Sequence, residues 1–115
     1  MNDFSITRRD DNMQVHLAVT GDLDLYRAPE FDDVLVEAEG EKWPTIVLDL
    51  RKLDFLDSMA LRLIMRTQAR AKQDGRRLLI VRGPEFLDRV LELSGLRDHL
   101  DIVDEPPTPT EPSAA

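Results

Sequence analysis

Two mostly apolar runs separated by a long helical pattern constrain the fold of this chain most strongly. Thr45–Leu50 and Leu78–Val81 are rich in strand-forming residues, and such runs suit strands covered on both faces. Between them, Met59–Gln73 carries inward positions at helical spacing. These positions are Leu61, Ile64, Met65, Gln68 and Ala71. Strands that alternate with helices predict an α/β fold with a largely parallel or mixed sheet.

The segments before these runs extend the alternation. Phe4–Arg9 and Met13–Thr20 alternate apolar and polar positions around Asp10–Asn12, a pattern that predicts a β-hairpin. Gly21–Asp24 is predicted to be a loop. Ala28-Pro29 then opens a helix, because proline is tolerated in the first helical turn.

The segments after the apolar runs complete the predicted order. Gly75 ends the long helical pattern, and Pro84–Leu93 predicts a third helix before Ser94-Gly95. A short last strand is predicted at Asp101–Val103. The expected fold is therefore β-β-α-β-α-β-α with a final β, in which four or five strands are flanked by three or four helices.

The length and the composition of the ends define the domain. The chain has 115 residues, enough for one domain with a sizeable core. Residues 104–115 are rich in proline and threonine and nearly lack apolar anchors, so they are predicted to form a disordered tail. The folded domain is predicted to span residues 3–103.

Composition excludes several classes of function. The chain has no cysteine, which excludes disulfides and thiolate zinc sites, and its two histidines, His16 and His99, are far apart in sequence. The net charge of −8 disfavours nucleic-acid binding and favours a partner with basic patches. No apolar stretch approaches the roughly 20 residues of a membrane helix, and the first residues do not resemble a signal peptide. We expect a cytoplasmic protein without metal or cofactor.

Asp57-Ser58 is the strongest candidate for chemistry, because it follows a strand and precedes a helix. A nucleophile elbow needs Gly-x-Ser-x-Gly, and the residues around Ser58 contain neither glycine. We therefore do not expect an enzyme. A phosphate-receiver domain would also gather acids at strand ends, but this chain starts with a hairpin and has no lysine after its last strand. The plainest alternative is a helix cap, in which Asp57 or Ser58 accepts a hydrogen bond from a free backbone N–H.

Three segments in register resemble the STAS domain of anti-sigma factor antagonists. Val19–Asp24 with Ala28-Pro29 resembles the family's GELD…AP segment. Ile46–Leu61 resembles its VVLDLS…FIDSSGL segment, and Leu91–Leu96 resembles its LELTGL end. The resemblance spans about residues 4–103.

The resemblance implies partner switching. In the family, the unphosphorylated antagonist binds an anti-sigma factor, often itself a serine kinase, and thereby releases a sigma factor. Phosphorylation of the first serine of the Asp-Ser-Ser-Gly motif abolishes binding, and a phosphatase restores it. The matching residue here is Ser58. The expected partner-binding surface comprises Asp22, Asp24, Asp57, Ser58 and Met59.

Two departures from the motif leave an alternative open. The family's second serine is Met59 here, and its glycine is Ala60. A STAS module that is not switched by phosphate is the second hypothesis. Such a module would act as a scaffold, as a transporter-associated subunit or as a sensor of a small ligand.

Overall fold

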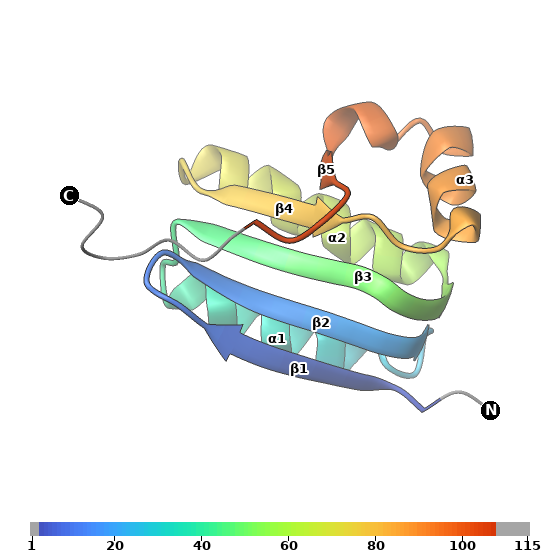
Figure 1. Ribbon diagram of the computed structural model, residues 1–115, viewed down its shortest axis with the longest axis horizontal. Helices are drawn as coiled ribbons and strands as arrows, with labels where there is room; N and C mark the ends of the chain where they lie inside the picture. The colour runs from blue at the N-terminus through green and yellow to red at the C-terminus, as the bar shows by residue number, and fades with distance from the viewer. Residues whose placement is uncertain (1–2, 108–115) are drawn as a thin grey trace.

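A mixed five-stranded sheet in the order β1-β2-β3-β4-β5 forms the frame of the molecule (Figure 1). The computed structural model describes residues 3–107. Its strands are β1 (Ser5–Asp10), β2 (Gln14–Leu23), β3 (Thr45–Leu56), β4 (Arg77–Val81) and β5 (Asp101–Val103). Its helices are α1 (Ala28–Gly40), α2 (Ser58–Gln73), α3 (Glu85–Leu93) and the 3-10 turn η1 (Arg97–His99). The predicted order and the predicted hairpin are confirmed, since β1 pairs antiparallel with β2 and all other neighbours are parallel.

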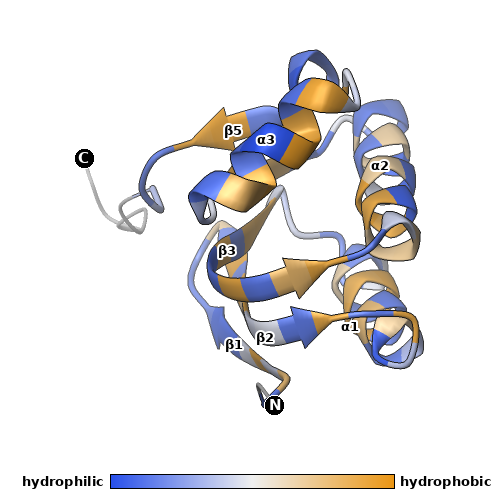
Figure 2. Ribbon diagram, turned by 90° about the vertical axis from the view of Figure 1, so that its right-hand side faces the viewer, coloured by the Kyte–Doolittle hydropathy of each residue, from blue (hydrophilic) through white to orange (hydrophobic). Residues whose placement is uncertain are grey.

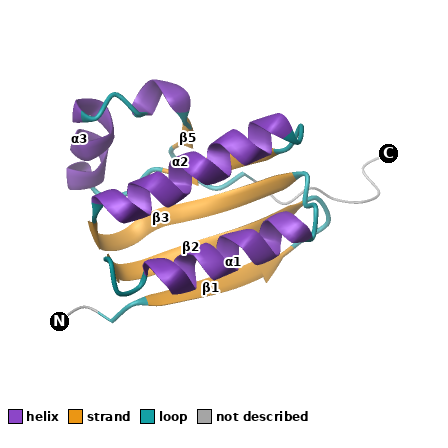
Figure 3. Ribbon diagram, turned by 180° about the vertical axis from the view of Figure 1, so that it is seen from behind, coloured by secondary structure: helices purple, strands orange, loops and turns teal. Residues whose placement is uncertain are grey.

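The main core lies between the sheet and the helices α1 and α2, which share one face of the sheet (Figures 2 and 3). Alternate residues of β2 point into this core, and Phe31 and Leu35 of α1 meet them there. Within the described residues, no helix lies across the opposite face of β1, β2 and β3 (Figure 1). This arrangement leaves part of one sheet face available for other contacts.

The apolar runs of β3 and β4 are buried on both faces, as their composition predicted. Alternate residues of β3, such as Ile46 and Leu48, belong to the main core. Val47 lies between them in sequence and forms a small second cluster with Leu79 and Val81, against which Val103 packs. Val103 belongs to the neighbouring strand β5, where it pairs with Val81, and it extends this cluster sideways on the second face of the sheet.

Strand β3 is longer than the apolar run that predicted it, and it continues to Leu56. Its pairing with β2 shifts register twice, once between Ala18 and Thr20 and once between Gly21 and Asp22. At each shift β3 contains one extra residue, which is the definition of a β-bulge. The segment Gly21–Leu23, expected to be a loop, is the end of β2 and pairs with this extension.

The buried face of α2 differs from the predicted one. Leu63 and Thr67 are buried, whereas Leu61, Met65 and Gln68 are only partly buried. The helix is rotated about its own axis relative to the prediction, so that the side of the helix that carries Ala60 faces the core. Ala60 is fully buried. Gly75 has the left-handed φ of 71° expected after a helix end.

The predicted tail, residues 104–115, falls partly outside the described part of the chain, because the structure describes it only as far as Pro107. Within residues 3–107, no helix combines the length and apolar character needed to cross a membrane.

Candidate functional site

The candidate site lies where β3 ends and α2 begins, at the edge formed by the carboxyl ends of β2 and β3. Asp57 is the N-cap of α2, and its side chain accepts a hydrogen bond from the backbone N–H of Ala60 at 3.1 Å. The backbone N–H of Asp57 donates to the carbonyl of Leu23 at 3.3 Å. The first bond confirms the cap interpretation for Asp57, and the second attaches the junction to the end of β2.

Ser58 is the first residue of α2, and its side chain is exposed. Its hydroxyl makes no hydrogen bond to any of residues 3–107. The backbone N–H groups of a helix's first turn lack intrahelical partners and favour negative charge. Ser58 therefore presents an exposed hydroxyl beside backbone N–H groups that favour negative charge.

Two shallow hollows flank the first turn of α2. One, of about 330 Å³, lies toward α1 and includes Met59, Leu25 and Pro29 in its lining. The other, of about 320 Å³, lies toward the turn after α3, and Ser58 shares its lining with Leu61, Arg62, Met65 and Leu96. Ser58 therefore stands beside apolar surface that a partner can fill.

The acidic residues of the predicted surface have different surroundings. Asp24 accepts hydrogen bonds from the backbone N–H groups of Tyr26 and Arg27, at 3.0 and 3.1 Å, and so shapes the turn before α1. Asp22 is partly buried and lies beside Phe55 in the register of β2 and β3. The bond between Asp57 and Leu23 brings this end of β2 against the start of α2. The predicted residues thus lie at one edge of the sheet. The side chain of Asp24, however, is hydrogen-bonded to the backbone of its own loop.

Three exposed apolar side chains near this edge were not predicted. Leu25 and Tyr26 in the loop after β2 are 58% and 87% exposed, and Phe55 near the end of β3 is 48% exposed. Met59, which was predicted, is 37% exposed. We call these four residues the apolar rim. Apolar residues in a short polar loop before a helix are a sequence signal that would have identified Leu25 and Tyr26.

Two arginines of α2 lie on the same side as Ser58. Arg66 pairs with Asp32 of α1, with 2.6 Å between Nη2 and Oδ1. Arg62 follows Ser58 by one helical turn and forms no ion pair within residues 3–107. The site therefore combines apolar contact area with charges of both signs. In the described part of the chain, no three side chains from histidine, aspartate or glutamate are arranged to hold a metal ion.

Comparison with known proteins gives concordant results. A family model described as "Mlab, STAS domain" matches residues 6–104. An anti-sigma-B factor antagonist from Staphylococcus epidermidis is 30% identical over 84 residues, which are 73% of this chain and 78% of that protein.

Solved structures also resemble this one. An anti-sigma factor antagonist from Mycobacterium paratuberculosis aligns with a TM-score of 0.79 at 18% identity, covering 90% of this chain and 87% of the other. The Bacillus protein SpoIIAA in its phosphorylated form aligns with a TM-score of 0.68 at 18% identity, covering 90% and 93%. At these identities the alignments establish a shared fold.

Proposed function

Because the chain belongs to the STAS domain family, we propose that it is an anti-sigma factor antagonist that works by reversible binding rather than by catalysis. The unphosphorylated surface around Ser58 and the apolar rim binds an anti-sigma factor in the cytoplasm, and a sigma factor is released. Phosphorylation of Ser58 by a serine kinase, which is often the anti-sigma factor itself in this family, abolishes that binding. A phosphatase restores it. The observation that carries the proposal is the exposed Ser58 hydroxyl at the start of α2, surrounded by apolar surface.

The position of Ser58 allows phosphorylation without loss of the fold. The side chain is exposed, and a phosphate there gains from the free N–H groups and the dipole of α2. The added charge of about −1.5 to −2 instead weakens the complex with the partner. Burial of a phosphate against apolar side chains has a high desolvation cost, and the phosphate repels acidic groups near it. A loss of about 2.7 kcal/mol in binding free energy corresponds to a hundredfold weaker complex.

The test is a binding titration against the purified anti-sigma factors of the source organism, with wild type, Ser58→Ala and Ser58→Asp. We expect one anti-sigma factor to bind wild type and Ser58→Ala with similar affinity, and Ser58→Asp at least ~30-fold more weakly. Gln73→Glu is the matched control, because it adds one negative charge at the opposite end of α2. That control should bind like wild type.

Equal binding of Ser58→Asp and wild type would refute the phosphate switch. The chain would then be a constitutive interaction module with the same surface. If no anti-sigma factor binds wild type, the proposed partner class is wrong. When an anti-sigma factor does bind, incubation of the complex with ATP tests whether Ser58 is the acceptor, because wild type should acquire a phosphate and Ser58→Ala should not.

A further inference from the structure

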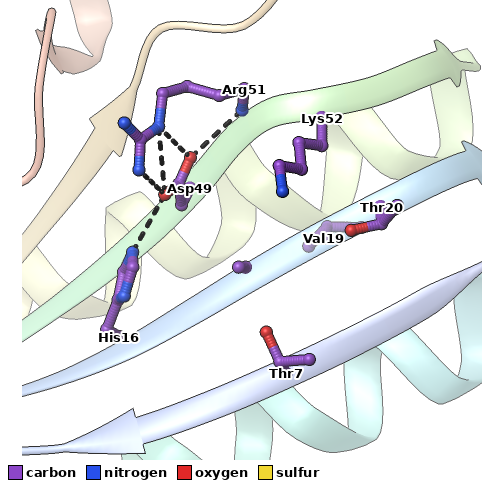
Figure 4. Close-up of a pocket in the computed structure, with 8 residues that line it drawn as sticks. Thr7, His16, Val19, Thr20, Asp49, Arg51 and Lys52 are labelled. Atoms are coloured by element: carbon purple, nitrogen blue, oxygen red, sulfur yellow. Dashed lines mark hydrogen bonds and ion pairs between the residues drawn. The ribbon is translucent and has the colours of Figure 1, made fainter.

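A second concave site lies on the sheet face that carries no helix (Figure 4). It is a hollow of about 580 Å³ over β1, β2 and β3, within the size range of small-molecule sites. It shares no residue with either hollow beside Ser58. Its lining consists of Thr7, His16, Ala18, Val19, Thr20, Asp49, Arg51 and Lys52.

A β-bulge in β3 creates this arrangement. Ala18 pairs with Asp49, but Thr20 pairs with Lys52, so β3 contains one residue more than β2 between these positions. In a regular strand, Asp49 and Lys52 would point to opposite faces. The bulge turns Lys52 to the face that Asp49 occupies, beside Arg51. Arg51 and Lys52 thus both lie on this face of the sheet. The small side chain of Ala18 leaves space between them and β1.

Asp49 anchors the basic side of the hollow. Its carboxylate is 6% exposed and accepts hydrogen bonds from Arg51, from Nε at 3.0 Å and from Nη2 at 2.7 Å. The Nε2 of His16 lies 3.1 Å from Oδ2 of the same carboxylate. Burial alone would raise the pKa of Asp49, but the hydrogen bonds from Arg51 and His16 hold the pKa below its usual value. The carboxylate is therefore ionised, and its charge is balanced by Arg51.

Positive charge remains on this face after that pairing. Lys52 forms no ion pair within residues 3–107, and its ammonium group points into the hollow, as does the Thr7 hydroxyl on the opposite side (Figure 4). Arg9 pairs with His16 in the register of β1 and β2, which places it on the same face, and it too has no ion pair in the described chain. Besides Asp49, Glu105 also exerts an electrostatic attraction on Arg51. In a chain of net charge −8, two unpaired cations on one sheet face are a local reversal of charge.

We propose that this hollow is a binding site for a phosphate group, either free or carried on a small organic molecule. Lys52 supplies a mobile point charge, and Thr7 and Thr20 supply hydroxyl donors. Arg51, held in place by Asp49, presents its remaining N–H groups, and Arg9 adds to the attractive field. The small side chain of Ala18 lets the ligand approach the sheet. The site is independent of Ser58 and of the proposed partner.

The test is an NMR titration of ¹⁵N-labelled protein with inorganic phosphate, and separately with glycerol 3-phosphate, at constant ionic strength. We expect saturable amide shifts centred on Thr7, Ala18, Thr20 and Lys52, with a dissociation constant on the order of 1 mM. Lys52→Gln should weaken binding at least ~5-fold, because it removes the unpaired cation. Lys72→Gln is the matched control, since it removes the same charge from an exposed position near the end of α2 and should leave binding unchanged.

A second variant, Ala18→Val, places extra volume on the floor of the hollow and should also weaken binding. A tighter constant for glycerol 3-phosphate assigns the site to a phosphorylated metabolite, and equal constants assign it to free phosphate. Absence of saturable shifts up to ~50 mM would overturn the proposal, as would equal affinity in Lys52→Gln. Shifts centred on the first turn of α2 would also overturn it, because they would place the anion beside Ser58.

Discussion

The tightest backbone approach among the glycines of the molecule occurs at Gly21, and it predicts a large effect of a single methyl group. Gly21 has a φ of 89°, in the left-handed region, and it is buried. A Cβ at this position would lie 2.1 Å from the carbonyl oxygen of Asp3. The N-terminal segment that leads into β1 thus passes against the backbone of β2 at Gly21.

The cost of Gly21→Ala has two parts. A left-handed conformation costs an alanine roughly 1–2 kcal/mol relative to glycine. Relief of the overlap requires the backbone around Asp3 to move by about 1 Å, since Cβ contacts below about 3.0 Å do not occur. That movement adds a strain of about 1–3 kcal/mol. We expect Gly21→Ala to lower the free energy of unfolding by about 3 kcal/mol, which is a decrease of roughly 2 M in the urea midpoint.

Three other glycines separate these two contributions in the same assay. Gly75 has a φ of 71° and no atom within 4 Å of the place where a Cβ would lie, so Gly75→Ala should cost only the left-handed contribution. Gly83 has no positive φ, but its Cβ would lie 2.7 Å from the carbonyl oxygen of Leu50, so Gly83→Ala tests overlap alone. Gly40 has neither problem, and Gly40→Ala should stabilise α1 by up to about 1 kcal/mol.

The urea midpoint of each variant, measured by circular dichroism, distinguishes these contributions. If Gly21→Ala is no less stable than Gly75→Ala, then the close passage of Asp3 over β2 contributes nothing and the reasoning fails. A lower m-value for Gly21→Ala would indicate instead that the N-terminal segment detaches in the native state.

Two further predictions concern carboxylates. Asp57→Ala should lower the free energy of unfolding by about 1 kcal/mol in chemical denaturation, because the N–H of Ala60 loses its acceptor, whereas Asp57→Asn should cost much less; equal losses would contradict the capping role. Asp49→Asn should destabilise the protein at neutral pH. Since the folded-state pKa of Asp49 is lowered, its contribution is fully present above its unfolded-state pKa of about 3.9 and disappears as the pH falls through the lower folded value. The stability difference between Asp49→Asn and wild type should therefore narrow below about pH 4, and a difference independent of pH would refute this assignment.

Much of the fold follows from local patterns. Alternation in β1 and β2, the apolar run that opens β3 and the glycine after α2 all predicted elements that the structure contains. The inward face of α2 was predicted less well, because Ala60 and Thr67 look neutral in a hydropathy pattern although they are fully buried. Small side chains permit close packing of a helix on a sheet, and only the three-dimensional arrangement reveals where that occurs.

The candidate site likewise contains residues that the sequence predicted and residues that it did not. Asp57 and Ser58 were predicted from their place between a strand and a helix, and most of the apolar rim was not. Phe55 belongs to a strand extension that exists only because bulges keep β3 paired with β2 beyond Leu50. Pairing energy between distant segments, rather than local propensity, sustains that extension.

The sequence by itself determined the order of strands and helices, the capped start of α2 and the absence of cysteine chemistry, because these depend on periodicity, on local backbone preferences and on composition. Tertiary structure alone decided which side chains meet. The bulge that turns Lys52 beside Arg51, the burial of Asp49 and the passage of Asp3 over Gly21 all arise from pairings between remote residues. No local pattern encodes such pairings, because they are selected by the packing of the whole sheet.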